Sequence, residues 1–144
     1  MKYQVELSER QIDVINKALD LYGRLHIGQT EAISRAIENK TFNDPEVDHE
    51  KIEDFVEELK TIAFPGLHRN AFFGIFSNEA GPEAQIAWDI QQVLRHRVSW
   101  DKAGNPSTRD HQTMWTVNYD SPMQSRPDEP LCEIRRTDDD RDST

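Results

Sequence analysis

The sequence predicts an α+β domain, in which a small, mainly antiparallel three-stranded sheet packs with three to four helices. Three observations support this class. Apolar residues alternate with polar ones near the N-terminus, recur at helical spacing through the middle of the chain, and alternate again near residue 115. A chain of 144 residues is the size of one domain and can bury a core without disulfides. We therefore expect one domain over 1–136, followed by a disordered acidic tail at 137–144.

The first expected strand is 3–7, where Tyr3, Val5 and Leu7 alternate with polar residues. Ser8 with Gln11 three residues later is the pattern of a capping box, which predicts that a helix begins next. The apolar face of this helix should contain Ile12, Ile15, Leu19, Tyr22 and Leu25. Thr30 can cap a short second helix.

A strongly acidic helix should follow. It begins after Asp44-Pro45 or after Asp48, and Pro65-Gly66 ends it. Nine acidic and three basic residues lie between residues 38 and 60. This charge indicates a solvated outer face or, alternatively, a docking face for a basic partner. The inward-facing residues are expected to be Ile52, Phe55, Val56, Leu59 and Ile62. The candidates for a docking face are Glu46, Glu50, Glu53, Asp54, Glu57 and Glu58.

The second half of the chain completes the predicted fold. Residues 67–78 are expected to form a structured loop, and Gly81-Pro82 opens a long helix that runs to about Ser99. After an exposed turn at 101–110, alternating residues predict a strand at 114–119. A proline-bearing connection at 121–130 then leads to a short third strand around Cys132 and Ile134.

Composition and motifs argue against several function classes. A formal net charge of −10 is unfavourable for binding duplex DNA, and no apolar run approaches the length of a membrane span. The N-terminus lacks the apolar segment of a signal peptide, and the single cysteine, Cys132, is consistent with a reducing compartment. No histidine or cysteine spacing matches a metal site, and no nucleophile lies in a recognised motif. We therefore expect a non-enzymatic protein without a cofactor.

One group of residues suggests a ligand. Arginines and aromatic side chains gather in two segments of an otherwise acidic chain, and guanidinium groups pair with phosphates while aromatic rings stack on bases. A purely structural role is the alternative, because cations also favour helix C-termini. The candidate ligand-binding residues are His68, Arg69, Asn70, Phe73, Arg95, Arg97 and Trp100.

Three segments, YQVELSERQIDVINKALDLYGRLHIGQ, EAQIAWDIQQVLRHRVSWD and WTVNYDSP, resemble a family of small accessory proteins encoded by tailed bacteriophages. The resemblance covers most of residues 3–122 and transfers no catalytic residue. It implies action in the host cytoplasm, where such proteins often counter host immunity. One hypothesis is a sponge that sequesters a cyclic oligonucleotide or a cyclic ADP-ribose signal, with a homo-oligomer as one way to form its pocket. The alternatives are an acidic inhibitor that mimics nucleic acid on a host defence enzyme, and a structural or assembly component of the phage.

Overall fold

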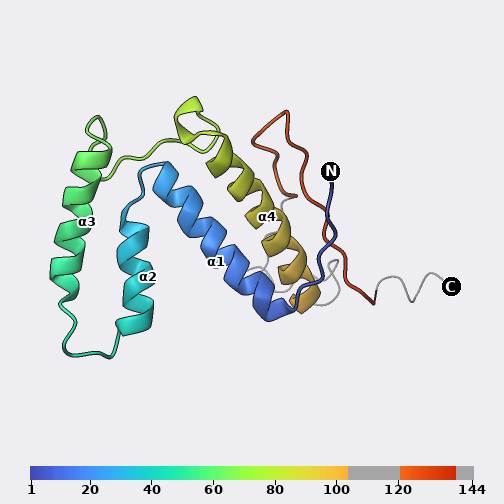
Figure 1. Ribbon diagram of the computed structural model, residues 1–144, viewed down its shortest axis with the longest axis horizontal. Helices are drawn as coiled ribbons and strands as arrows, with labels where there is room; N and C mark the ends of the chain where they lie inside the picture. Colours follow the sequence, from blue (N-terminus) through green and yellow to red (C-terminus); the bar gives the residue numbers. More distant parts are fainter. Residues whose placement is uncertain (104–120, 139–144) are drawn as a thin grey trace.

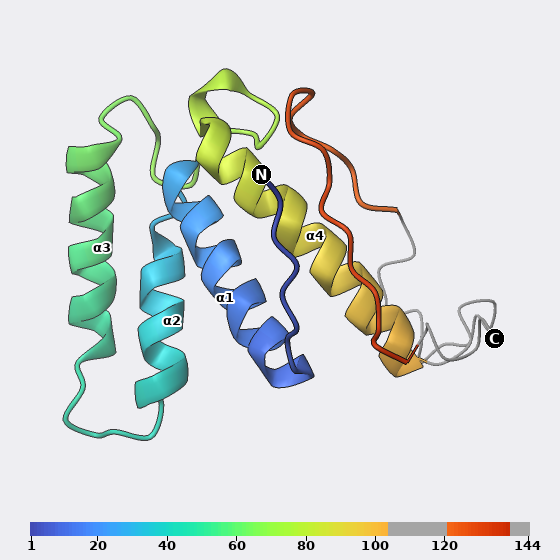
Figure 2. The same cartoon turned by 45° about the vertical axis from the view of Figure 1, so that its right-hand side comes forward.

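The computed structural model describes residues 1–103 and 121–138. Within them the chain forms four α-helices, α1 (Glu9–His26), α2 (Glu31–Thr41), α3 (His49–Ala63) and α4 (Pro82–Ala103), with a short 3-10 turn, η1 (Asn78–Ala80), before α4. The helices lie side by side in the order α3, α2, α1, α4 (Figures 1 and 2). The main contacts between helices follow this order: α2 with α3, α1 with α2, and α1 with α4.

The predicted α+β class is wrong, because the described residues are helical and contain no strand. Residues 1–8 are irregular and exposed, and the segment around Cys132 and Ile134 is also irregular. The strand predicted at 114–119 lies outside the described residues. Alternation of apolar and polar residues produces a strand only where a neighbouring strand supplies hydrogen bonds. In the described segment after position 120, Ser125 and Arg126 are instead hydrogen-bonded to residues of α4.

The helix boundaries agree well with the capping signals. Ser8 accepts a hydrogen bond from the Gln11 backbone while the Gln11 side chain accepts one from the Ser8 backbone, so the predicted capping box of α1 is confirmed. Of the two possible starts for α3, Asp48 is the one used, since its side chain accepts from the Lys51 backbone at 3.0 Å. Thr30 precedes α2 but makes no capping bond with its side chain. Its hydroxyl instead donates to the Val56 carbonyl of α3 at 3.5 Å.

The seam between α1 and α4 is lined by small residues. Gly23 is buried, and a Cβ atom placed on it would lie 3.8 Å from the Ala84 carbonyl oxygen. Ala80, Ala84 and Ala87 are buried on the α4 side. At the other end of the seam, Lys102 of α4 pairs with Glu9 of α1 at 2.8 Å. The two helices are therefore antiparallel and close together, with a thin apolar core.

The connection between α1 and α2 requires a glycine. Gly28 has a φ of +86°, a conformation that side chains of L residues rarely adopt. A Cβ atom there would also lie 2.6 Å from Cδ1 of Leu67, which follows α3 in the chain. This turn therefore reverses the chain so that α2 lies next to α1, and it lets the residues after α3 pack against the Gly28 backbone (Figures 1 and 2).

The predicted inward face of α3 is largely wrong. Val56 and Lys60 are buried, but Phe55, Leu59 and Ile62 are exposed. The reason is the position of α3 at the edge of the row (Figure 1), where α2 is its main helical neighbour. A helix with one neighbour can cover only one side of its apolar surface.

Residues 121–138 run alongside α4 (Figures 1 and 2). Asp89, buried on α4, accepts the Ser125 backbone N–H with both carboxylate oxygens, at 2.9 and 3.0 Å. The Ser125 hydroxyl donates to the Gln85 carbonyl at 3.1 Å, and Arg126 donates to the Gln85 side chain at 3.3 Å. We call residues 121–138 the C-terminal strap.

None of the described helices combines the length and the apolar character needed to cross a membrane.

Candidate functional site

The predicted ligand-binding residues fall into two groups. His68, Arg69, Asn70 and Phe73 follow α3, and the Phe73 backbone N–H donates to the Ile27 carbonyl, just beyond the C-terminal end of α1, at 2.9 Å. The other group, Arg95, Arg97 and Trp100, occupies the last turns of α4.

The two groups lie near opposite ends of α1. The last turn of α4 meets the start of α1 through the Lys102–Glu9 ion pair, whereas the first group adjoins its other end. A helix of 18 residues is about 27 Å long. One copy of the chain therefore does not bring the two groups into a common pocket, and a role in nucleotide binding stays a prediction.

Two of the three predicted arginines already have acidic partners. Arg69 forms an ion pair with Glu57 of α3. The Nε of Arg97 lies 3.0 Å from both carboxylate oxygens of Asp101. A phosphate would have to compete with these carboxylates, which makes either arginine a weaker anion site than a free guanidinium.

His96, between Arg95 and Arg97, has a structural role that sequence reasoning did not identify. The Trp100 indole N–H donates to Nε2 of His96 at 2.9 Å, and the two rings meet edge to face. Desolvation by the surrounding chain lowers the pKa of His96 below its ordinary value. Both observations favour the neutral imidazole, because Nε2 can accept the indole proton only when it is unprotonated.

We expect acid to destabilise this end of α4. Because the pKa of His96 is lower in the folded chain than in the unfolded one, the unfolded state binds a proton first. The free energy of unfolding should therefore fall as the pH drops below about 6.5 and level off below the folded pKa. Urea unfolding at about pH 7.5 and about pH 5.5 measures this effect. His96→Gln should weaken the pH dependence, while the control His68→Gln, at an exposed position, should leave it unchanged.

The six acidic candidates are all exposed, but they do not form one face. Glu50, Glu53 and Glu57 follow one another at spacings of three and four residues and so share one side of α3. Asp54 and Glu58 form a second row, and Glu46 lies before the helix. At 100° per residue, the second row borders the exposed apolar residues of α3, whereas the first row is on the far side.

Phe55, Leu59 and Ile62 are spaced four and three residues apart and form one stripe along α3. The exposed fractions are 67% for Phe55 and 71% for Ile62. Next to this stripe is an open groove of about 350 Å³, lined by Ile37, Asp48, Lys51, Ile52, Phe55 and Val56. We call the stripe, together with Asp54 and Glu58, the α3 surface. It combines contiguous apolar area with a charged border, in which the carboxylates of Asp54 and Glu58 outnumber the one ammonium group of Lys51.

Sequence reasoning found the acidic part of the α3 surface but assigned its apolar part to the core. The order of residues around the helix gives no clear signal, because acidic residues lie beside the exposed Phe55 and also beside the buried Val56 and Lys60.

The described residues, 1–103 and 121–138, contain no group of three or more histidine, cysteine or acidic side chains arranged to hold a metal ion. Comparisons of the chain with protein-family models, with curated proteins and with solved structures gave no match. The resemblance to phage accessory proteins therefore stays a prediction, and function has to be argued from the geometry.

Proposed function

We propose that this chain is a non-catalytic binding protein whose α3 surface docks on a basic, partly apolar groove of another protein. The observation that carries the proposal is the exposure of Phe55, Leu59 and Ile62 in one stripe. Contiguous exposed apolar residues on a helix commonly mark a protein-interaction site. Amphipathic helices bind grooves through side chains at this i, i+4, i+7 spacing.

Charge identifies the kind of partner. Asp54 and Glu58 border the stripe, and the whole chain carries a formal net charge of −10. A groove edged by lysine or arginine would be attracted to this surface and oriented by it. If the predicted phage origin holds, the partner is a host defence protein in the bacterial cytoplasm. Sequestration of a nucleotide signal is a weaker proposal, because it needs a second copy to unite the two groups of ligand-binding residues.

The proposal is tested with paired charge reversals on α3. A tagged chain captures its partner from bacterial host cells, and the purified partner is then titrated against variants. Asp54→Lys with Glu58→Lys should weaken binding by about tenfold or more, since both side chains border the apolar stripe. Phe55→Ala should cost a similar factor, because large apolar anchors dominate interface energies.

The control is Glu50→Lys with Glu53→Lys, which makes the same charge change on the far side of the same helix. It should reduce affinity much less, mainly through long-range charge that salt screens. Equal losses from both pairs would instead favour the extended nucleic-acid mimic considered from the sequence. A captured protein whose binding is insensitive to Phe55→Ala would refute docking through the α3 surface.

A further inference from the structure

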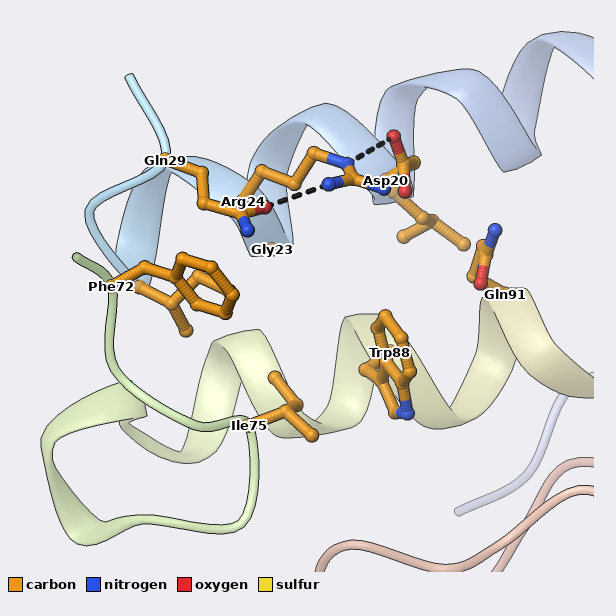
Figure 3. Close-up of a pocket in the computed structure, with 10 residues that line it drawn as sticks. Asp20, Gly23, Arg24, Gln29, Phe72, Ile75, Trp88 and Gln91 are labelled. Carbon is orange, nitrogen blue, oxygen red and sulfur yellow. Dashed lines mark hydrogen bonds and ion pairs between the residues drawn. The ribbon is translucent and has the colours of Figure 1, made fainter. Parts of the chain in front are cut away.

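A second concave site lies where the C-terminal half of α1 meets the first half of α4 and the loop before it (Figure 3). It is a pocket of about 180 Å³, and an apolar cavity of about 150 Å³ is large enough to bind benzene. Phe72, which lines the pocket, is 53% exposed, so the pocket is open to solvent on this side. It can therefore admit one aromatic ring. Its apolar walls comprise Leu19, Ile27, Phe72, Ile75 and Trp88.

The charged groups at the rim of the pocket already balance each other. Nε of Arg24 donates to the Asp20 carboxylate at 2.8 Å, and a terminal nitrogen of Arg24 donates to Oε1 of Gln29 at 2.7 Å (Figure 3). An anionic ligand would have to compete with the Asp20 carboxylate for the guanidinium group. A neutral ligand therefore suits the pocket better than an anion.

The bond from Arg24 fixes the orientation of the Gln29 amide. Arginine has only hydrogen-bond donors, so the amide atom that faces it is the oxygen, Oε1. The amide nitrogen, Nε2, is on the other side of the group and points toward Phe72 (Figure 3). In the part of the chain that the structure describes, Nε2 has no acceptor, yet it is not among the buried side-chain atoms that lack a partner. Gln29 thus presents an accessible donor to the pocket.

Gln91, on the α4 side of the pocket, also presents a donor. Its Oε1 is buried, so a ligand in the pocket cannot reach this oxygen. The accessible polar atom of Gln91 is therefore Nε2, which can only donate. Because both glutamines that line the pocket expose donors, the ligand that fits them carries an acceptor.

We propose that this pocket binds a small neutral aromatic compound of the aryl ketone class, whose carbonyl oxygen accepts a hydrogen bond from Nε2 of Gln29. The ring would lie between Phe72 and Trp88, where apolar contact supplies most of the affinity. The hydrogen bond favours a ligand with an acceptor over a ligand of the same shape without one. This site is separate from the α3 surface and does not depend on the function proposed there.

The test compares acetophenone with ethylbenzene, in which a methylene group replaces the carbonyl. Each probe is titrated into the isotope-labelled full chain, and binding is followed by NMR shifts of the Trp88 indole and of neighbouring amides. Ethylbenzene is the more hydrophobic probe, so the measured quantity is the ratio of the two affinities, compared between the native chain and a variant. Gln29→Glu keeps an acceptor for Arg24 but replaces the amide nitrogen with an oxygen. It should shift the ratio toward ethylbenzene by about three- to tenfold, the factor expected for one neutral hydrogen bond.

Two further variants keep the test decisive. Gln92→Glu makes the same chemical change at a glutamine of α4 that does not line the pocket, and it should leave the ratio unchanged. Ile75→Trp alters only the loop before α4 and should fill the pocket, abolishing the shifts caused by both probes, so it serves even if Gln29→Glu folds poorly.

The proposal is overturned if neither probe shifts the pocket signals or if Ile75→Trp leaves these shifts intact. It is also overturned if folded Gln29→Glu keeps the native ratio, or if Gln92→Glu changes the ratio equally. Because none of these measurements involves a partner protein, their failure is distinguishable from failure of the α3 proposal.

Discussion

Lys60→Met should lower the free energy of unfolding by about 1–3 kcal/mol, and the unfolding midpoint should fall by several degrees. Lys60 is 6% exposed on the inner side of α3. Its ammonium group donates to the Arg69 carbonyl at 2.8 Å and to the Ala71 carbonyl at 2.6 Å. Methionine preserves the apolar length of the side chain but removes both donors. The two carbonyls then lose their partner in a partly buried place.

Thermal unfolding followed by circular dichroism measures this effect, and hydrogen exchange localises it. Exchange should accelerate first in residues 67–73, the segment that Lys60 holds against α3. Lys51→Met is the matched control, because Lys51 is exposed on the same helix. It should change stability by less than about 0.5 kcal/mol. Equal effects of the two substitutions would mean that the Lys60 hydrogen bonds make no net contribution to the free energy of unfolding.

Asp89→Ala should release the C-terminal strap and cost about 1–3 kcal/mol. Asp89 is 4% exposed, and both of its carboxylate oxygens accept the Ser125 backbone N–H. Alanine leaves that N–H without its acceptor. Ser125→Ala should have a smaller effect, since it removes the hydroxyl bond to Gln85 but keeps the bond to Asp89.

Cys132, the single cysteine, lies in the strap and reports its release. Although Cys132 is exposed, desolvation by the surrounding chain raises the pKa of its thiol above the ordinary value, and the nearby charge of Asp89 also raises it, while a backbone hydrogen bond acts in the opposite direction. Release should therefore lower the pKa and speed alkylation at a fixed pH near neutrality, because the thiolate is the reactive form. Asp89→Asn separates the two causes, as it removes the charge and keeps an acceptor. Unchanged alkylation in Asp89→Ala would contradict the proposed attachment.

Local signals in the sequence predicted the helices well. Ser8 with Gln11 marked the start of α1, Pro82 marked the start of α4, and Asp48 was one of the two starts considered for α3. These signals act over three or four residues, so a single segment contains all the information. The prediction of a sheet was wrong because a strand is stable only when it pairs with another strand, which can be distant in sequence. The alternation at Tyr3, Val5 and Leu7 contains no information about such a partner.

The candidate sites were predicted less well, and the reason is long-range packing. The apolar spacing of Phe55 and Ile62 is the same whether a helix faces a core or a partner. Only the position of α3 at the edge of the row decides between these outcomes. Likewise, the pairing of Arg69 with Glu57 joins residues twelve positions apart in sequence.

The arrangement of the helices in one row, with alanine and glycine along the α1–α4 seam, also bears on thermodynamics. Among the described residues no large side chain is fully buried. The heat-capacity change of unfolding grows with the apolar area that leaves the interior. It should therefore be small for a chain of this length, and the curve of stability against temperature should be broad and shallow. A partner that covers the α3 surface would add buried apolar area, so the complex would have a more sharply curved temperature dependence than the free chain.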